Sequence, residues 1–187
     1  MSNRLVEKQV LYDGKKVRLE VHLLEDDEGK RSRREVCVHT GAVVVLAFVK
    51  PDRILLIRNH RYAAGQILVE LPAGTLEKKE DPMNCAGREL QEETGYLAAR
   101  LKSLGSFFSS PGILSEKMYA YAAYDLQKVG QALEEDEDLE VFECDFDEAV
   151  TMIKDARIQD AKTIATLLIY DKFHRTPGQS GTTTAQG

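Results

Sequence analysis

The segment 74–96, GTLEKKEDPMNCAGRELQEETGY, limits the possible folds of this chain more than any other part of its sequence. Asp81 or Asn84 can cap the start of a helix here, and Gly95 suits the left-handed residue that ends one. The preceding Leu-Pro-Ala-Gly, residues 71–74, is typical of a strand that ends in a glycine-permitted bend. The sequence therefore predicts a strand, a loop and a helix in succession.

The predicted helix places three carboxylates on one face, because Glu92 and Glu93 follow Glu89 by three and four residues. Like charges this close destabilise a bare helix. A divalent cation reverses the effect, since Mg²⁺ prefers oxygen ligands and is typically held by one or two carboxylates plus substrate phosphates. We therefore expect a metal site, to which the loop can add the backbone carbonyl of Ala73, while Arg88 pairs with neighbouring acids.

Length and composition set the class of protein. The 187 residues fit one domain of ordinary size, and 43% hydrophobic with 30% charged residues is typical of a soluble globular protein. No apolar run approaches the roughly 18 residues of a membrane span, and the N-terminus does not have the pattern of a signal peptide, so we expect a cytoplasmic protein. A net charge of −6 argues against nucleic-acid binding. The three cysteines have no paired spacing and are interpreted as free thiols.

Strand patterns before the acidic helix predict two groups. Residues 5–11, 17–24 and 34–39, separated by turn residues, predict an antiparallel meander. Residues 41–49 and 53–58 predict a central hairpin, whose first strand is apolar enough to be buried on both faces. A meander cannot bury both faces alone, so we expect it to pack on the main body or on a second subunit.

Further strands are predicted after the acidic helix, at 97–108, 117–126 and 141–144, together with two helices that end near residues 154 and 173. On the last helix, core-facing spacing is predicted for Ala161, Ile164, Ala165, Leu168 and Ile169. Residues 176–187 are rich in Gly, Thr and Ser and are expected to form a disordered tail.

Three further features bear on chemistry. Arg61 is either a surface residue or a bidentate phosphate ligand, and Glu70 is either an outward strand residue or an additional carboxylate at the metal site. A second acidic run, EEDEDLE at 134–140, is either a solvated loop or the source of a general base. The first acidic cluster fits one to three Mg²⁺ or Mn²⁺ ions that bridge a diphosphate and lower the pKa of a bound water.

The spacing of the acidic segment resembles the signature of the Nudix hydrolases: Gly74, five residues, Glu80, seven residues, then Arg88-Glu89-Leu90-x-Glu92-Glu93-x-Gly95. Only Tyr96 departs from the usual aliphatic residue. The chain also resembles the ADP-ribose pyrophosphatase branch, because Pro111 lies sixteen residues beyond Gly95 and the segments RNHRY and VELPAG precede the signature. Asn59 and His60 depart from the residues usual in that branch.

This resemblance implies an α/β (α+β) fold, a Nudix-type α/β/α sandwich with a mixed central sheet, over residues 41–175, and a dimer-forming β meander over residues 1–40. It implies that Ala73, Glu89 and Glu93 bind Mg²⁺ or Mn²⁺. The implied catalytic residues are Glu92 and a general base at Glu135 or Glu137. The implied substrate-binding residues are Arg61, Glu70, Arg34, Pro111 and Glu116.

The activity implied is hydrolysis of ADP-ribose to AMP and ribose 5-phosphate by a homodimer. A close alternative is another nucleoside diphosphate sugar, such as ADP-glucose or GDP-mannose, because the metal site does not distinguish these substrates. A different class of function is a Nudix-fold module that senses ADP-ribose without cleaving it. Such a module is expected to lose a signature carboxylate, and this chain retains all of them.

Overall fold

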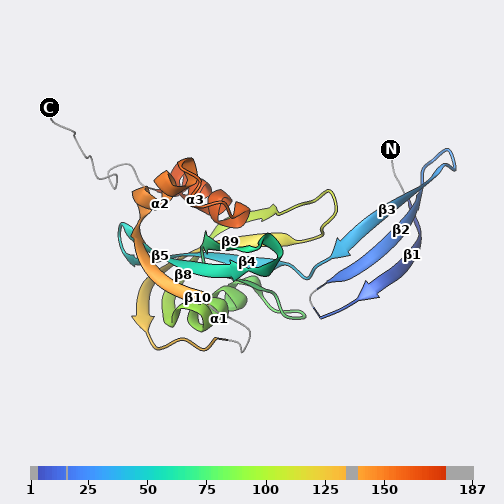
Figure 1. The fold of residues 1–187 in the computed structure, drawn as a ribbon. Helices are drawn as coiled ribbons and strands as arrows, with labels where there is room; N and C mark the ends of the chain where they lie inside the picture. Colours follow the sequence, from blue (N-terminus) through green and yellow to red (C-terminus); the bar gives the residue numbers. More distant parts are fainter. Residues whose placement is uncertain (1–3, 16, 134–138, 176–187) are drawn as a thin grey trace. The chain divides into compact units, whose positions relative to one another are not determined.

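Apart from a 3₁₀ turn at Tyr62–Ala64 and a short strand at Ala73–Thr75, the strands and helices follow the order predicted from the sequence (Figure 1). The structure is a computed structural model that describes residues 4–15, 17–133 and 139–175. The elements are β1 (Arg4–Asp13), β2 (Arg18–Glu25), β3 (Arg31–Val38), β4 (Ala42–Lys50), β5 (Arg53–Arg61), the 3₁₀ turn η1 (Tyr62–Ala64), β6 (Gln66–Glu70), β7 (Ala73–Thr75), α1 (Pro82–Thr94), β8 (Tyr96–Phe108), β9 (Lys117–Lys128), β10 (Leu139–Asp145), α2 (Phe146–Lys154) and α3 (Ala161–Phe173).

Contacts divide the chain into two compact units. One contains the described residues up to Gly41 together with Phe107–Met118, and the other contains Ala42–Ser106 and the described residues from Tyr119 onward. The domain limits predicted from the sequence stay a prediction, and the predicted tail, 176–187, lies outside the described residues. No helix in the described part of the chain is long and apolar enough to span a membrane.

The first unit is an antiparallel sheet in the order β1-β2-β3, which confirms the predicted meander. A turn closed by Gly14 N–H donating to Val17 O, at 2.9 Å, joins the first two strands. Most side chains of this sheet are half-buried or exposed, and β1 is exposed throughout. Such a sheet gains little from apolar burial when the unit is considered by itself.

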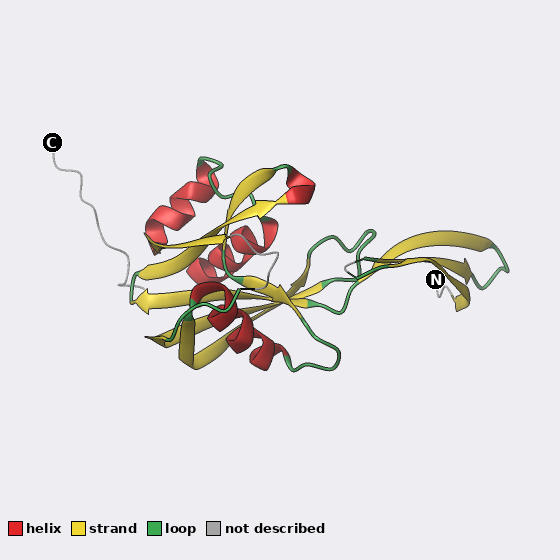
Figure 2. Cartoon of the chain, turned by 60° about the horizontal axis from the view of Figure 1, so that its bottom comes forward, coloured by secondary structure: helices red, strands yellow, loops and turns green. Residues whose placement is uncertain are grey.

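The second unit is a seven-stranded sheet in the order β10-β5-β4-β9-β8, with β6 paired to β5 and β7 paired to β4. Figure 2 shows helices on both faces of this sheet. The central strand β4 is buried from Ala42 to Phe48 because its two faces are both covered. Val43 and Val45 share a core cluster with Cys85, Ala86 and Leu90 of α1.

The opposite face of the sheet packs on α2 and α3 through aromatic rings. The Phe48 ring lies 5.0 Å from Tyr170 of α3 and 6.2 Å from Phe146 of α2, measured between centroids. Helices therefore cover the two faces of one sheet, which confirms the predicted α/β/α sandwich. The site helix α1 belongs to one layer, and α2 and α3 belong to the other (Figure 1).

The ends of α1 follow the predicted local signals. The Asp81 carboxylate accepts hydrogen bonds from Met83 N and Asn84 N, so Asp81 rather than Asn84 is the N-cap. Gly95 has φ = 76° and its N–H donates to Gln91 O, which ends the helix in the left-handed region where glycine is favoured.

The predicted core face of α3 is wrong. The helix buries Thr163, Thr166, Leu167 and Tyr170, whereas Leu168, predicted to face the core, is 45% exposed. The threonines can be buried because their hydroxyls are bonded within the protein: Thr163 Oγ1 accepts from Leu71 N at 2.8 Å and donates to Asp160, and Thr166 Oγ1 donates to Lys162 O. An apolar periodicity alone does not reveal such a polar contact face.

Candidate active site

The acidic face of α1 and the loop before it form one cluster. Glu89 and Glu93, one helical turn apart, are 9% and 3% exposed. Glu93 Oε2 accepts a hydrogen bond from Ala73 N at 2.8 Å. A Cβ on Gly74 would lie 1.8 Å from Glu89 Cδ, so this close approach requires glycine. The structure therefore brings together Ala73, Glu89 and Glu93, the three residues predicted to bind metal.

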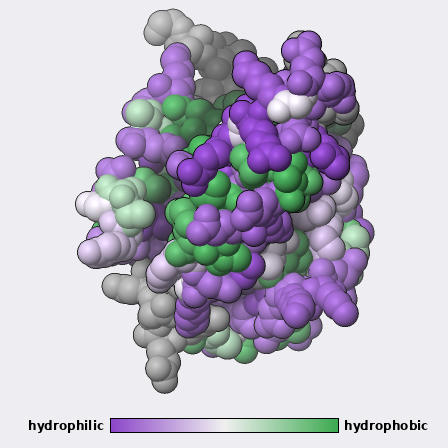
Figure 3. Space-filling model, turned by 90° about the vertical axis from the view of Figure 1, so that its right-hand side faces the viewer, coloured by the Kyte–Doolittle hydropathy of each residue, from purple (hydrophilic) through white to green (hydrophobic). Residues whose placement is uncertain are grey.

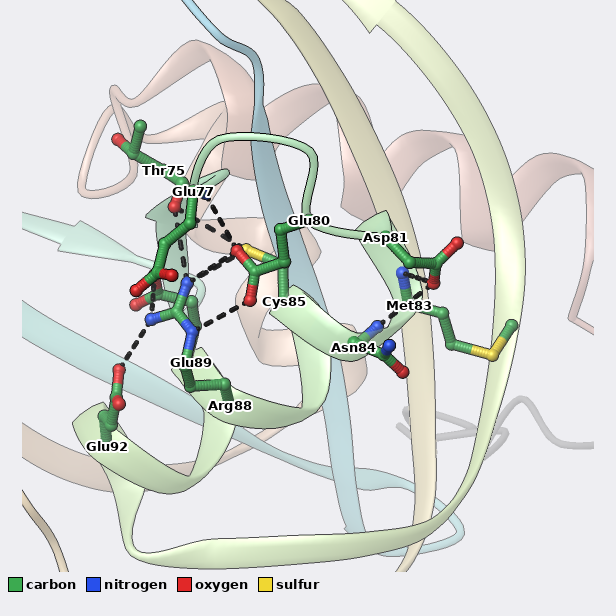
Figure 4. Close-up of polar contacts among 10 residues, drawn as sticks. All are labelled: Thr75, Glu77, Glu80, Asp81, Met83, Asn84, Cys85, Arg88, Glu89 and Glu92. Atoms are coloured by element: carbon green, nitrogen blue, oxygen red, sulfur yellow. Dashed lines mark hydrogen bonds and ion pairs between the residues drawn. The ribbon is translucent and has the colours of Figure 1, made fainter.

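Arg88 links the carboxylates of the cluster (Figure 4). Its guanidinium donates to both oxygens of Glu80, each at 3.0 Å, and to Glu92 at 2.8 Å, and it forms an ion pair with Glu89 at 2.8 Å. The hydrogen bond from Arg88 lowers the pKa of Glu80 to about 2, and Glu80 in turn is the main cause of a raised pKa for Arg88. The predicted pairing of Arg88 with its acidic neighbours is confirmed.

A buried thiol lies beneath this arginine. Cys85 has no exposed surface, its Sγ lies 3.4 Å from Arg88 Nη2, and it donates to Thr75 O at 3.7 Å. Burial raises the pKa of this thiol to about 12, so Cys85 is a neutral packing residue of α1.

Glu70 is not the outward strand residue that one of its two predictions describes. Its side chain has no exposed surface and accepts two hydrogen bonds from Arg61, at 2.8 and 2.6 Å. A third donor is Lys162 Nζ, at 2.6 Å. Glu70 is thus not an outward strand residue but the centre of an ion cluster, and its role at the metal or substrate site stays a prediction. The Arg61 pKa is raised, chiefly by its bond to Glu70 and further by the charge of Glu93.

Sequence reasoning missed Lys162 and Gln131. Lys162 lies 92 residues from Glu70, and no local pattern connects the two. Gln131 Nε2 donates to Glu93 O at 2.7 Å, and Ala132 N donates to Glu92 O at 3.1 Å. The segment 129–132 therefore satisfies the last carbonyls of α1.

The remaining predicted residues lie in the first unit or outside the described residues. Arg34, Pro111 and Glu116 belong to the first unit, where Arg34 donates to Arg33 O and Glu116 lies 3.5 Å from His39 Nδ1. Their role in substrate binding stays a prediction. Glu135 and Glu137, the predicted bases, lie outside the described residues.

The acidic face has donors suited to a hard cation. Within residues 4–15, 17–133 and 139–175, no three His, Cys, Asp or Glu side chains form a ready metal cage. Glu89 and Glu93 nevertheless offer two buried carboxylates on one helix face. Because Mg²⁺ is commonly held by one or two carboxylates with substrate phosphates completing its shell, this pair fits Mg²⁺ or Mn²⁺.

The α/β/α sandwich, together with a loop and helix that present buried carboxylates to one site, defines a class of protein. The sequence model of the NUDIX domain matches residues 38–167, and the chain belongs to this family. The resemblance to the Nudix hydrolases is thereby confirmed, and the relatives below extend it to the ADP-ribose pyrophosphatases.

Relatives of known name cover most of the chain. It is 39% identical over 163 residues to the methanol dehydrogenase activator of Bacillus methanolicus, covering 86% of this chain and 88% of that protein. It is 36% identical over 165 residues to the ADP-ribose pyrophosphatase of Bacillus subtilis, covering 87% and 89%. The GDP-mannose pyrophosphatase of Yersinia enterocolitica is 37% identical over 163 residues, covering 81% and 84%.

A solved structure shares the fold. The crystal structure of an ADP compounds hydrolase matches with a TM-score of 0.85, covering 96% of this chain and 98% of the other, at 22% sequence identity.

Proposed function

We propose that this protein hydrolyses the diphosphate bond of a nucleoside diphosphate sugar, with ADP-ribose as the favoured substrate and AMP and ribose 5-phosphate as products. The observation that carries the proposal is the buried pair Glu89 and Glu93, of which Glu93 lies within electrostatic reach of Arg61. A carboxylate pair suited to a divalent cation, next to a guanidinium, matches the charge of a diphosphate. The ADP-ribose pyrophosphatase relative supports the choice of substrate.

The protein's own groups have distinct parts in this proposal. Arg61 binds a phosphate oxygen, and Arg88 holds Glu89 and Glu92 in place. Glu92, 33% exposed, accepts or relays a proton, and Glu135 or Glu137 acts as the general base that deprotonates the attacking water. Glu89, Glu93 and the Ala73 carbonyl would hold a Mg²⁺ or Mn²⁺, which would neutralise charge at the phosphates and make a bound water more acidic.

We further propose a homodimer in which the first unit contacts a second copy. Apolar side chains of β1 are open to solvent in one chain, among them Leu5, Leu11 and Tyr12, each at least 48% exposed. Figure 3 shows apolar side chains among hydrophilic ones on this side of the molecule. In this proposal Arg34, on β3 of the same unit, helps to bind the adenosine end of the substrate. The cytoplasmic location stays a prediction from the sequence.

A phosphate-release panel tests the activity. ADP-ribose, ADP-glucose, GDP-mannose, NADH and dinucleoside polyphosphates are incubated with the protein and an alkaline phosphatase, which releases phosphate only from the phosphomonoester products. Each substrate is tested with Mg²⁺ and with Mn²⁺ in this coupled assay. The arm with EDTA is read by chromatography of the nucleotide products, because EDTA inactivates the zinc-dependent alkaline phosphatase. We expect ADP-ribose to be hydrolysed fastest and only with metal. A preference for GDP-mannose would favour the alternative supported by the Yersinia relative. Binding of ADP-ribose without any product would instead indicate a sensing module.

A further inference from the structure

Four charged side chains form a compact cluster behind the carboxylate site. Glu70, with no exposed surface, lies at its centre, and both of its oxygens accept from Arg61. Lys162 Nζ lies 2.6 Å from Glu70 Oε2 and 2.9 Å from Asp160 Oδ1. The buried carboxylate of Glu70 is thus compensated by two cations that come from different elements, β5 and α3.

The two cations of this cluster differ in their exposure. The side chain of Arg61 is 40% exposed, whereas that of Lys162 is 15% exposed. Arg61 uses Nε and Nη2 for Glu70, and its Nη1 makes no hydrogen bond to any residue that the structure describes. A guanidinium has five donors in a rigid fork, so one edge of Arg61 can hold Glu70 while the other meets a phosphate.

Lys162 is itself fixed by the first turn of α3. Asp160 caps this helix by accepting from Thr163 N at 3.0 Å, and the Thr163 hydroxyl accepts from Leu71 N at 2.8 Å. These contacts tie the start of α3 to the residue that follows Glu70. The position of the Lys162 ammonium relative to Glu70 is therefore set by backbone contacts and not by a mobile side chain alone.

Removing one partner from a buried ion pair is costly, because the other charge is left uncompensated. If Arg61 were the sole partner of Glu70, its interaction with a phosphate would weaken its ion pair with Glu70. The buried charge of Glu70 would then be poorly compensated. We propose that Lys162 is a positioning residue of the active site: as a second cation on Glu70, it frees the outer edge of Arg61 to bind the substrate diphosphate. This inference rests on the proposed function, since it assumes a diphosphate substrate.

The test combines variants of Lys162 with Arg61→Ala. Lys162→Met removes the ammonium, Lys162→Gln keeps a hydrogen-bond donor without the charge, and Lys162→Arg keeps the charge. Lys172→Met is the matched control, because it removes an exposed cation from the last turn of the same helix. Thermal unfolding of each variant establishes that it is folded. If Lys162→Met does not fold, the Lys162→Gln variant takes its place in every comparison.

The kinetic readout is the division of the effect between KM and kcat for ADP-ribose. We expect Lys162→Met to raise KM about tenfold, the effect of one charge-assisted hydrogen bond, and to change kcat much less. Lys162→Arg should restore KM, and Lys172→Met should leave it unchanged. In the Arg61→Ala background, Lys162→Met should add nothing, because the residue through which it acts is gone. An unchanged KM, or a full additional effect in that background, would overturn the inference.

A binding measurement separates this inference from the proposed function. Calorimetric titration with ADP-ribose in EDTA needs no turnover, and we expect Lys162→Met to weaken binding about tenfold there as well. If the wild type binds ADP-ribose but hydrolyses none of the panel, the proposed function fails. The ratio of the dissociation constants of Lys162→Met and the wild type then still decides the role of Lys162. Absence of ADP-ribose binding by the wild type in EDTA, together with absence of hydrolysis in Mg²⁺, would overturn both.

Discussion

Three glutamates of the second unit have three different structural roles. Glu70 is fully buried between two cations, Glu80 fixes a guanidinium, and Glu93 accepts from the backbone of β7. The last two could be predicted from spacing along the sequence, because a helix and its adjoining loop bring nearby residues together. The environment of Glu70 could not, because it depends on Lys162 far along the chain.

Glu93→Gln tests the metal site at this scale. Glutamine keeps an oxygen that can accept from Ala73 N, so we expect the fold to be retained. It removes the negative charge, and we expect Mg²⁺-dependent kcat for ADP-ribose to fall by at least about 10²-fold. Steady-state kinetics and circular dichroism check both expectations. Glu148→Gln, on α2, is the control, and wild-type turnover in Glu93→Gln would remove the basis of the metal site.

The pH dependence of stability tests the ion pair of Glu80 with Arg88. The folded-state pKa of Glu80 is about 2, below its ordinary value of 4.5, so the folded state favours the charged form. The stabilisation is complete above pH 4.5 and is lost as pH falls towards 2. We expect Glu80→Gln to lower the free energy of unfolding by about 1–3 kcal/mol at pH 7.

Urea unfolding between pH 7 and pH 2.5 measures this difference. The difference in the free energy of unfolding between wild type and Glu80→Gln should become smaller as the pH falls. A gap that stays constant over this range would contradict the role of the ion pair. Glu7→Gln, an exposed position on β1, serves as the control and should show no such trend.

At the scale of elements, features set by local sequence signals were predictable, and features set by contacts between distant residues were not. The ends of α1 were predictable because Asp81 and Gly95 act within one turn of the helix. The buried face of α3 was not, because Thr163 and Thr166 are buried through hydrogen bonds that apolar spacing does not encode. The contact of segment 129–132 with the end of α1 was likewise hidden, since its donors are mainly backbone N–H groups.

Gln131→Ala tests that contact. The amide of Gln131 donates to Glu93 O, so its loss loosens the end of α1 that carries Glu92 and Glu93. We expect kcat for ADP-ribose to fall about threefold to tenfold with little change in KM, because substrate contacts remain while the catalytic groups lose their alignment. Gln91→Ala, on the same helix, is the comparison. A rise in KM at constant kcat would contradict this role.

For the whole molecule, the sandwich and its site follow from strand and helix patterns, whereas the assembly does not. The first unit leaves apolar side chains of β1 exposed, and nothing in the sequence specifies what covers them. Surface of this kind, rimmed by polar residues, commonly marks a protein interface. The proposed homodimer is therefore open to a direct measurement.

Light scattering should give a mass of about twice the 21.0 kDa of one chain at micromolar concentration. Leu11→Asp places a charge in the exposed apolar surface of β1, and we expect it to yield monomers with reduced kcat/KM. Leu168→Asp introduces the same change at a similarly exposed position on α3 and should leave the mass unchanged. A wild-type mass near that of one chain would refute the dimer.

The buried thiol of Cys85 can be used to measure how often α1 separates from the sheet. With no exposed surface and a pKa raised to about 12, this sulfur is protected from alkylating reagents while α1 lies on the sheet. Modification requires α1 to separate locally, so in a Cys37→Ser, Cys144→Ser background the labelling rate measures the free energy of that opening. We expect Mg²⁺ with ADP-ribose to slow labelling, since binding to the closed form opposes separation of the helix.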